Sequence, residues 1–166
     1  MIEVRRVRPE EYVDAGEVTA SAWSPAGSLD EQVWLSFRAR VANVASRDAV
    51  AAVYVATEGD RILGSVTLEI EERIVDEENS TTLAPEEAHV RVLGVAPEAR
   101  RRGVGRILMC HCADVARQYR KARLTLNTSL KNTSAQNFYE SIGYTRLPDI
   151  QVEDGSMLCS YELKLR

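Results

Sequence analysis

The segment 100–106 combines four arginines with two glycines, a composition suited to binding an anion. It reads RRRGVGR, with glycines at 103 and 105. Glycine lets the backbone approach a ligand closely. A helix that begins here would also present unpaired N–H groups and the positive end of its dipole. We therefore predict a phosphate-binding loop, and the competing interpretation is a solvated basic turn.

The flanking residues predict a strand before this loop and a helix after it. The strand is indicated by four apolar and mostly β-branched residues, Val90, Val92, Leu93 and Val95. Pro97 ends it because proline lacks the N–H that a central strand donates. Apolar residues then recur at helical spacing at Val104, Leu108, Cys112, Val115 and Tyr119. A Walker loop is excluded because no Lys–Ser/Thr pair follows the glycines, and the dinucleotide fingerprint needs a third glycine.

A second segment, residues 132–144, reads NTSAQNFYESIGY and follows a predicted strand around Leu124 and Leu126. With both segments in this order, the chain resembles the GNAT superfamily of acetyl-CoA-dependent N-acetyltransferases. R-x-x-G-x-G at 100–105 is similar to the pyrophosphate loop of that family, and N-x-x-A-x-x-F-Y-E-x-x-G-Y is similar to its later helix. The two motifs together cover 19 of the 166 residues.

The resemblance implies a site for acetyl-CoA and a proton donor. The backbone of Leu93, Gly94 and Val95 would pair with the pantetheine, and Gly94 or Val95 would supply an N–H to the oxyanion. The implied cofactor-binding loop consists of Arg100, Arg101, Arg102, Gly103, Val104, Gly105 and Arg106. Tyr139 stands at the general-acid position, with a packed core aromatic as its alternative. Asn132 would either cap its helix or contact the cofactor.

The general base is left open by the sequence. His89 begins the strand before the glycine loop, and an unperturbed pKa near 6.5 suits base chemistry at neutral pH. The other interpretation of His89 is a strand-end histidine bonded to the backbone. Glu69 and Glu87 could act through a water, and the resemblance also allows a water chain alone.

The order of predicted elements is β-α-α-β-β-β-α-β-α-β-β, in one domain over residues 1–166. The resemblance implies an α/β fold with a mixed, mostly antiparallel sheet of about seven strands and about four helices. Its fourth and fifth strands would splay apart. We expect the second helix to carry Trp34, Phe37, Val41 and Val44 on one face, after a capping box at Ser28 and Glu31. The acidic stretch Glu71–Glu87 is interpreted as a loop.

Composition excludes several other classes of protein. The chain has 166 residues, 45% hydrophobic and 28% charged, with no apolar run of bilayer length. A net charge of -4 argues against general nucleic-acid affinity. Three cysteines make no disulfide framework, so we expect a cytoplasmic protein. Cys110, His111 and Cys112 point to different sides of a helix, so we expect no metal site.

The predicted activity is transfer of an acetyl group from acetyl-CoA to a primary amine on a small molecule, peptide or protein. Trp23, Trp34, the loop Ser24–Asp30 and the acidic stretch would border the acceptor, with a weak preference for a cationic one. The alternatives are a non-catalytic acyl-CoA-binding sensor and a tRNA-directed acetyltransferase toxin, which the acidic charge disfavours. A homodimer is an assembly that the resemblance allows.

Overall fold

The computed structural model describes residues 1–23, 30–75, 80–152 and 155–166. Its strands are β1 (Glu3–Arg6), β2 (Ala52–Glu58), β3 (Arg61–Glu69), β4 (Arg73–Val75), β5 (Ser80–Thr82), β6 (Glu87–Val95), β7 (Arg123–Ser129), β8 (Thr145–Gln151) and β9 (Met157–Lys164). Its α-helices are α1 (Tyr12–Ala22), α2 (Glu31–Ala42), α3 (Val44–Val50), α4 (Val104–Gln118) and α5 (Thr133–Ser141). The predicted mixed α/β fold is confirmed, with five α-helices in the described ranges where about four were expected.

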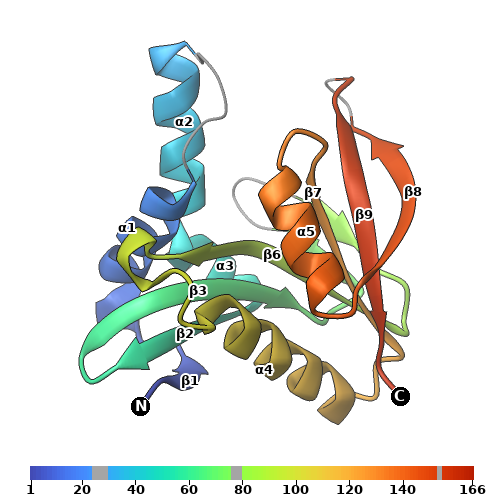
Figure 1. Ribbon diagram of the computed structural model, residues 1–166, viewed down its shortest axis with the longest axis horizontal. Coiled ribbons are helices and arrows are strands. Elements are labelled where there is room, and N and C mark those ends of the chain that lie inside the picture. Colours follow the sequence, from blue (N-terminus) through green and yellow to red (C-terminus); the bar gives the residue numbers. More distant parts are fainter. Residues whose placement is uncertain (24–29, 76–79, 153–154) are drawn as a thin grey trace.

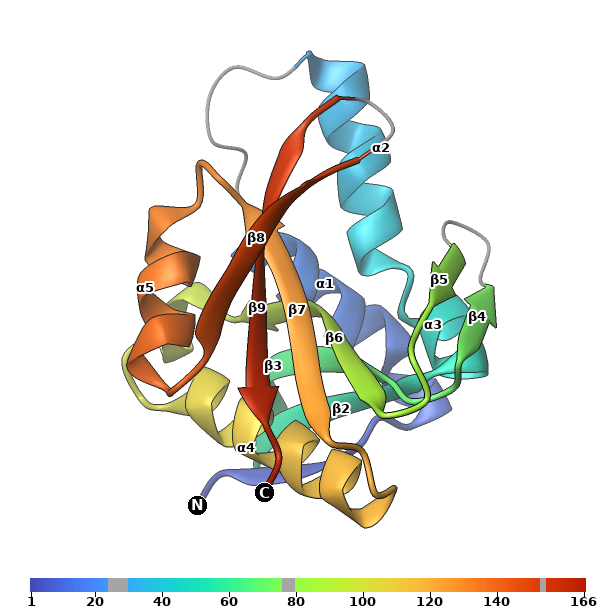
Figure 2. The same cartoon turned by 90° about the vertical axis from the view of Figure 1, so that its right-hand side faces the viewer.

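One sheet of seven strands forms the centre of the molecule, in the order β1-β2-β3-β6-β7-β9-β8. Neighbouring strands are antiparallel except β6 and β7, which are parallel. The β6–β7 pairing runs from Glu87 and Arg123 to Val90 and Leu126, and both strands continue beyond it without pairing to each other. Figure 2 shows the two strands separating. The predicted splay between the fourth and fifth strands of this sheet is confirmed.

Helices cover both faces of the sheet. A Cβ built on Gly64 of β3 would meet Val104 and Leu108 of α4, whereas one built on Gly94 of β6 would meet Thr19 and Ala22 of α1. Gly64 and Gly94 occupy successive positions of the β3–β6 register, so their side-chain directions point to opposite faces. Figure 1 shows α1, α2 and α3 grouped together, away from α4 and α5.

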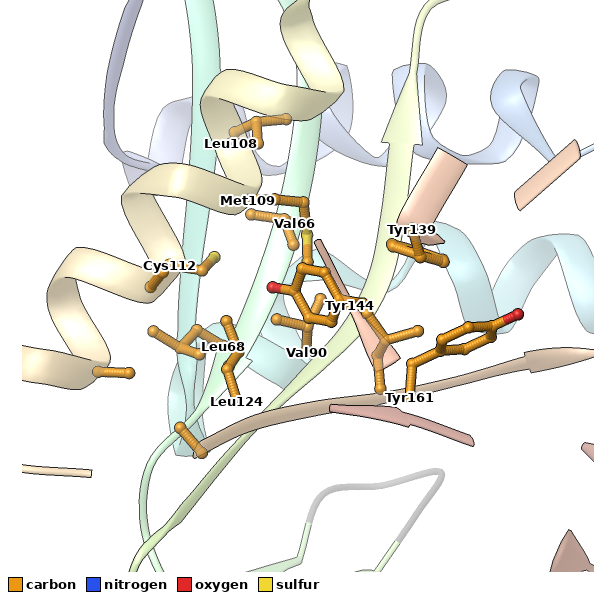
Figure 3. Close-up of a cluster of buried hydrophobic side chains, with 14 of the residues drawn as sticks. Val66, Leu68, Val90, Leu108, Met109, Cys112, Leu124, Tyr139, Tyr144 and Tyr161 are labelled. Carbon is orange, nitrogen blue, oxygen red and sulfur yellow. The ribbon is translucent and has the colours of Figure 1, made fainter. Parts of the chain in front are cut away.

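The main core lies between the sheet and the face of α4 and α5. Val66 and Leu68 of β3, Val90 of β6 and Leu124 of β7 pack with Leu108, Met109 and Cys112 of α4, and Tyr139, Tyr144 and Tyr161 extend the cluster toward α5 (Figure 3). Strand side chains alternate between faces, so residues next to these apolar positions point to the opposite face. His89, Arg91 and Thr125 lie there for this reason.

Three local expectations differ from the structure. The second helix ends at Ala42 and a separate helix starts at Val44, because the Asn43 side chain accepts a hydrogen bond from the Ser46 N–H and caps the new helix. The acidic stretch contains the β4–β5 hairpin and is not entirely loop. The N-cap of α2 is Asp30, whose side chain accepts from the Gln32 N–H, while Ser28 of the expected capping box lies outside the described residues.

Candidate active site

A β-bulge in β6 marks the place where the sheet opens. Ser65 pairs with Gly94 and Thr67 with Arg91, so Val92 and Leu93 together face the single residue Val66 of β3. Val92 has a φ of 52°, a left-handed conformation that strains a β-branched residue. Such strain is characteristic of functional sites, where surrounding structure holds it in place.

Helix α1 packs directly on this bulge. The indole N–H of Trp23 donates a 3.0 Å hydrogen bond to the carbonyl oxygen of Leu93. A Cβ on Gly94 would lie 3.1 Å from the Cα of Thr19, so glycine is needed for this close approach. The three residues predicted to contact pantetheine, Leu93, Gly94 and Val95, thus lie at the opening between β6 and β7.

The predicted phosphate loop lies at the N-terminus of α4. Gly103 is the N-cap with a φ of 79°, a conformation that favours glycine, and nothing lies within 4 Å of a Cβ built on it. The Ile107 N–H bonds to the Gly103 carbonyl, so the N–H groups of residues 104–106 have no partner within the helix. The loop therefore offers open space and backbone donors to an anion.

The arginines of this loop fall into two pairs. Arg100 donates to the Ala22 carbonyl at 3.3 Å, and Arg102 forms a 2.7 Å ion pair with Glu58 at the end of β2. The side chains of Arg101 and Arg106 are exposed and make no hydrogen bond or ion pair within the described ranges. The second pair is thus available to phosphate, whereas the first also holds the loop against α1 and β2.

Two other residues of the predicted cofactor site have structural roles. The side chain of Val104 is buried in the core, so only its backbone N–H can face a ligand. Asn132 is the N-cap of α5 and accepts a 3.0 Å hydrogen bond from the Ala135 N–H.

Gly105 lies under α5, because a Cβ there would be 3.2 Å from Cζ of Phe138. This close approach places α5 beside the loop.

Tyr139 projects from α5 into an aromatic cluster. Its ring lies 5.2 Å from that of Phe138, 5.9 Å from Tyr144 and 6.1 Å from Tyr161, centroid to centroid, and Figure 3 shows the last two beside it. Its exposed fraction is 8%. Burial, with a smaller effect of Cys112, raises the pKa of Tyr139 above its usual value of 10. The phenol therefore stays protonated at neutral pH and can donate a hydrogen bond.

His89 is joined to Thr125 and Glu87 across the parallel strands. Nδ1 of His89 lies 2.7 Å from Oγ1 of Thr125, which donates a 2.6 Å hydrogen bond to Oε1 of Glu87. Burial lowers the pKa of His89 to about 4, with the Glu87 charge raising it and the Arg91 charge lowering it. The imidazole is therefore neutral at pH 7. It does not titrate near 6.5 as the sequence alone suggested, because the sheet desolvates it.

Glu69 is fully buried opposite His89 in the β3–β6 register. Its Oε2 lies 3.4 Å from a guanidinium nitrogen of Arg91. Glu69 does not line the large pocket beside His89, so it has no direct route to a molecule bound there. Of the three candidate bases, His89 and Glu87 line that pocket and Glu69 does not.

The pocket has a volume of about 660 Å³ and lies on the face covered by α1, α2 and α3. One wall is aromatic: Trp23 and Phe37 line it with their rings 5.7 Å apart, and Trp34 stacks on Phe37 from outside the lining. The polar wall contains His89, Glu87, Arg91, Arg47 and Arg40. Thr82, the last residue of β5, and Leu83, which follows it, also line the pocket.

Parts of the predicted acceptor border lie outside the described residues, namely 24–29 and 76–79. Within the described ranges, no cluster of three metal-ligand side chains occurs. In the same ranges, no helix is both long and apolar enough to span a membrane. Sequence reasoning missed Thr125, although the alternation Leu124-Thr125-Leu126 indicated that this hydroxyl points away from the apolar face of its strand.

Comparison with known proteins identifies the class of this fold and site. Residues 14–144 match the model of the Acetyltransferase (GNAT) family, so the chain belongs to this family. A search among curated proteins gave no match.

Solved structures share the fold at low sequence identity. A GNAT-family protein from Desulfovibrio desulfuricans has a TM-score of 0.74 at 18% identity, with full coverage of both chains. The PaiA N-acetyltransferase from Thermoplasma acidophilum, in complex with coenzyme A, has a TM-score of 0.73 at 16% identity, covering 98% of this chain and 99% of its own. The yncA protein from Salmonella typhimurium, with acetyl-CoA, has a TM-score of 0.65 at 17% identity and coverages of 99% and 94%.

Proposed function

We propose that this protein transfers the acetyl group of acetyl-CoA to the nitrogen of a primary amine. The observation that carries the proposal is the opening between β6 and β7, where pairing stops at Val90 and Leu126. The anion-binding loop before α4 lies on one face of the sheet beside this opening. The His89 pocket lies on the other face. Acetyl-CoA bound in the opening would therefore place its pyrophosphate at the loop on one face, and an amine would approach its thioester from the other face.

The donor side fits the parts of coenzyme A. The N–H groups of residues 104–106 would hold the pyrophosphate, with Arg101 and Arg106 adding charge-assisted hydrogen bonds. The strand edge at Leu93, Gly94 and Val95 would pair with the amides of pantetheine as an added strand does. Gly105 keeps Phe138 of α5 close to the loop. A CoA-bound relative with this fold supports the assignment.

The two faces together supply the proton chemistry, His89 from the acceptor side and Tyr139 from the donor side. The amine nitrogen would attack the thioester carbonyl, forming a C–N bond as the C–S bond breaks. His89, neutral at pH 7, would take the proton released by the amine, and Tyr139 would protonate the departing thiolate. The raised pKa keeps the phenol protonated at neutral pH, so its proton is available for a hydrogen bond to the thiolate.

The pocket walls suit an acceptor with an apolar portion, which would lie against Trp23 and Phe37. The described charged lining consists of Arg40, Arg47 and Arg91 with the single carboxylate of Glu87. This balance gives no support to the preference for a cationic acceptor drawn from the acidic stretch. The proposed acceptor is therefore a primary amine that carries an apolar group.

The test is a thiol-release screen with acetyl-CoA against primary amines that differ in apolar size and charge, run beside calorimetry with CoA. The proposal predicts CoA binding and amine-dependent thiol release. Binding without release for every amine would favour the alternative, a non-catalytic acyl-CoA sensor. Absence of CoA binding by the folded protein would reject both.

A further inference from the structure

We infer that Thr125 and Glu87 are positioning residues that hold His89 in its Nδ1-protonated form, so that Nε2 is the nitrogen that accepts the proton of the amine. The base role of His89 rests on the function proposed above. The hydrogen-bond relay itself does not, because it follows from the geometry of β6 and β7.

The sheet register places the relay across two strands. Residues directly opposite each other share a face, and His89 pairs with Thr125 in the parallel β6–β7 ladder. Glu87 is two residues before His89 on β6 and therefore also shares this face. The relay lies where β6 and β7 are still paired, immediately before they separate after Val90. Backbone pairing of the two strands therefore sets the positions of His89 and Thr125 relative to each other.

The direction of the hydrogen bonds follows from the number of available protons. A threonine hydroxyl has one proton, and the 2.6 Å contact to Oε1 of Glu87 uses it. The Ala88 carbonyl, at 3.4 Å from the same oxygen, is a longer alternative acceptor. Oγ1 can then only accept from His89, so Nδ1 must carry the proton in the 2.7 Å contact. Nε2 of a neutral imidazole is left with its lone pair.

This direction requires an ionised Glu87. Burial raises the pKa of Glu87, but the hydrogen bonds from Thr125 and the Ala84 N–H and the charges of Arg123 and His89 outweigh burial, so its pKa lies below the usual value. Arg123 lies 3.4 Å from Oε2 of Glu87 and pairs with it from β7. The carboxylate is therefore an acceptor at neutral pH and cannot reverse the relay.

Other charged groups face His89 from the neighbouring elements. They are Arg91 on β6, Glu69 on β3, Arg123 on β7, Glu162 opposite Thr125 on β9, and the arginines Arg40 and Arg47 of the pocket wall. Within this set, Glu87 raises the pKa of His89 and Arg91 lowers it. The relay therefore opposes the effect of burial and stabilises the imidazolium that forms when Nε2 takes a proton.

Three substitutions test the hydroxyl of Thr125 and the negative charge of Glu87 separately. Thr125→Val removes the acceptor of Nδ1 with little change of volume, whereas Thr125→Ser keeps it. Glu87→Gln keeps an acceptor oxygen for Thr125 but removes the negative charge. Thr57→Val is the matched control for a threonine-to-valine change in the sheet, because Thr57 is buried in β2 and does not line the pocket.

The primary readout is the tautomer of His89, measured by ¹⁵N NMR of the imidazole. The chain has two histidines, so a His111→Gln variant assigns both signals. The wild type, Thr125→Ser, Glu87→Gln and Thr57→Val should show Nδ1–H, and Thr125→Val should lose this preference. In Glu87→Gln the titration midpoint of His89 should move below that of the wild type.

Activity provides the second readout. At pH 7 we expect kcat to fall at least about tenfold in Thr125→Val, with Thr125→Ser recovering most of the loss. An Nε2–H tautomer in the wild type, or an unchanged tautomer in Thr125→Val, would overturn the relay. Loss of activity in Thr125→Ser equal to that in Thr125→Val would overturn the role of the hydroxyl. Failure of the wild type to acetylate any amine would instead reject the proposed function, and the NMR result would stand independently.

Discussion

Replacing His89 with glutamine should remove the contribution of this residue to the acid sensitivity of folding above pH 5. The pKa of His89 is lowered by burial from 6.5 to about 4 in the folded chain, while the unfolded chain titrates near 6.5. As the pH falls through 6.5, the unfolded state therefore binds a proton that the folded state does not. Stability rises with pH wherever the unfolded state binds more protons, so the wild type loses stability on acidification.

The size of this loss follows from the two pKa values. One pKa unit corresponds to about 1.36 kcal/mol, so the full loss approaches about 3 kcal/mol near pH 4. Between pH 8 and pH 5 the same two values give about 2 kcal/mol. Glu11 contributes mainly at lower pH, because the hydrogen bond from Arg5 lowers its pKa to about 2. The range from pH 8 to pH 5 therefore separates the histidines from Glu11, and the His89→Gln comparison separates His89 from His111.

The assay is urea unfolding of the wild type and His89→Gln at pH 8, 6.5 and 5. The variant should lose about 2 kcal/mol less than the wild type over this range. His111→Gln is the control: burial also lowers the pKa of His111, but its removal should leave the His89 contribution in place. Parallel pH profiles for the wild type and His89→Gln would show that His89 titrates as in the unfolded chain and would refute its desolvation.

Three further predictions concern the donor side. Tyr139→Phe should keep CoA affinity while single-turnover kcat falls about tenfold or more, and an unchanged rate would remove the phenol from the reaction. Arg101→Ser should weaken CoA binding in calorimetry by about tenfold, or about 1.4 kcal/mol. The matched Arg102→Ser should have a smaller effect, because the Arg102 guanidinium is partly engaged by Glu58. Equal effects would contradict the inference that Arg101 is free for phosphate while Arg102 holds the loop against β2. Gly105→Val should lower both the melting temperature and CoA affinity, because its side chain would strike Phe138, and wild-type values for both would contradict this contact.

The order of the main elements could be predicted because local patterns determine it, whereas the splayed sheet was predicted from the family resemblance. The valine-rich strand ends before Pro97, and apolar residues at helical spacing follow Gly103, so strand, loop and helix were each visible in the sequence. The break between α2 and α3 was not predicted, because Val41 and Val44 continue the helical spacing across Asn43. The capping hydrogen bond of Asn43 competes with that continuation and ends the helix.

The candidate site was predictable only as a set of residue types. The left-handed Val92 depends on the register between β3 and β6, which no property of valine indicates. Glu69 was one candidate base that could act through a water, but its side chain is fully buried and its carboxylate lies 3.4 Å from the Arg91 guanidinium. Thr125 and His89 are 36 residues apart and meet because two parallel strands pair. Contacts of this kind arise from topology, which local spacing does not determine.

The central claim is that this chain acetylates the nitrogen of a primary amine with acetyl-CoA as donor. The most direct measurement is mass spectrometry and NMR of the product after incubation of the purified protein with acetyl-CoA and amines bearing an apolar group. We predict one acetyl group per amine, bonded to nitrogen, and one equivalent of free CoA. Saturable binding of acetyl-CoA with no acetylated amine and no release of CoA above the protein-free rate would contradict the account.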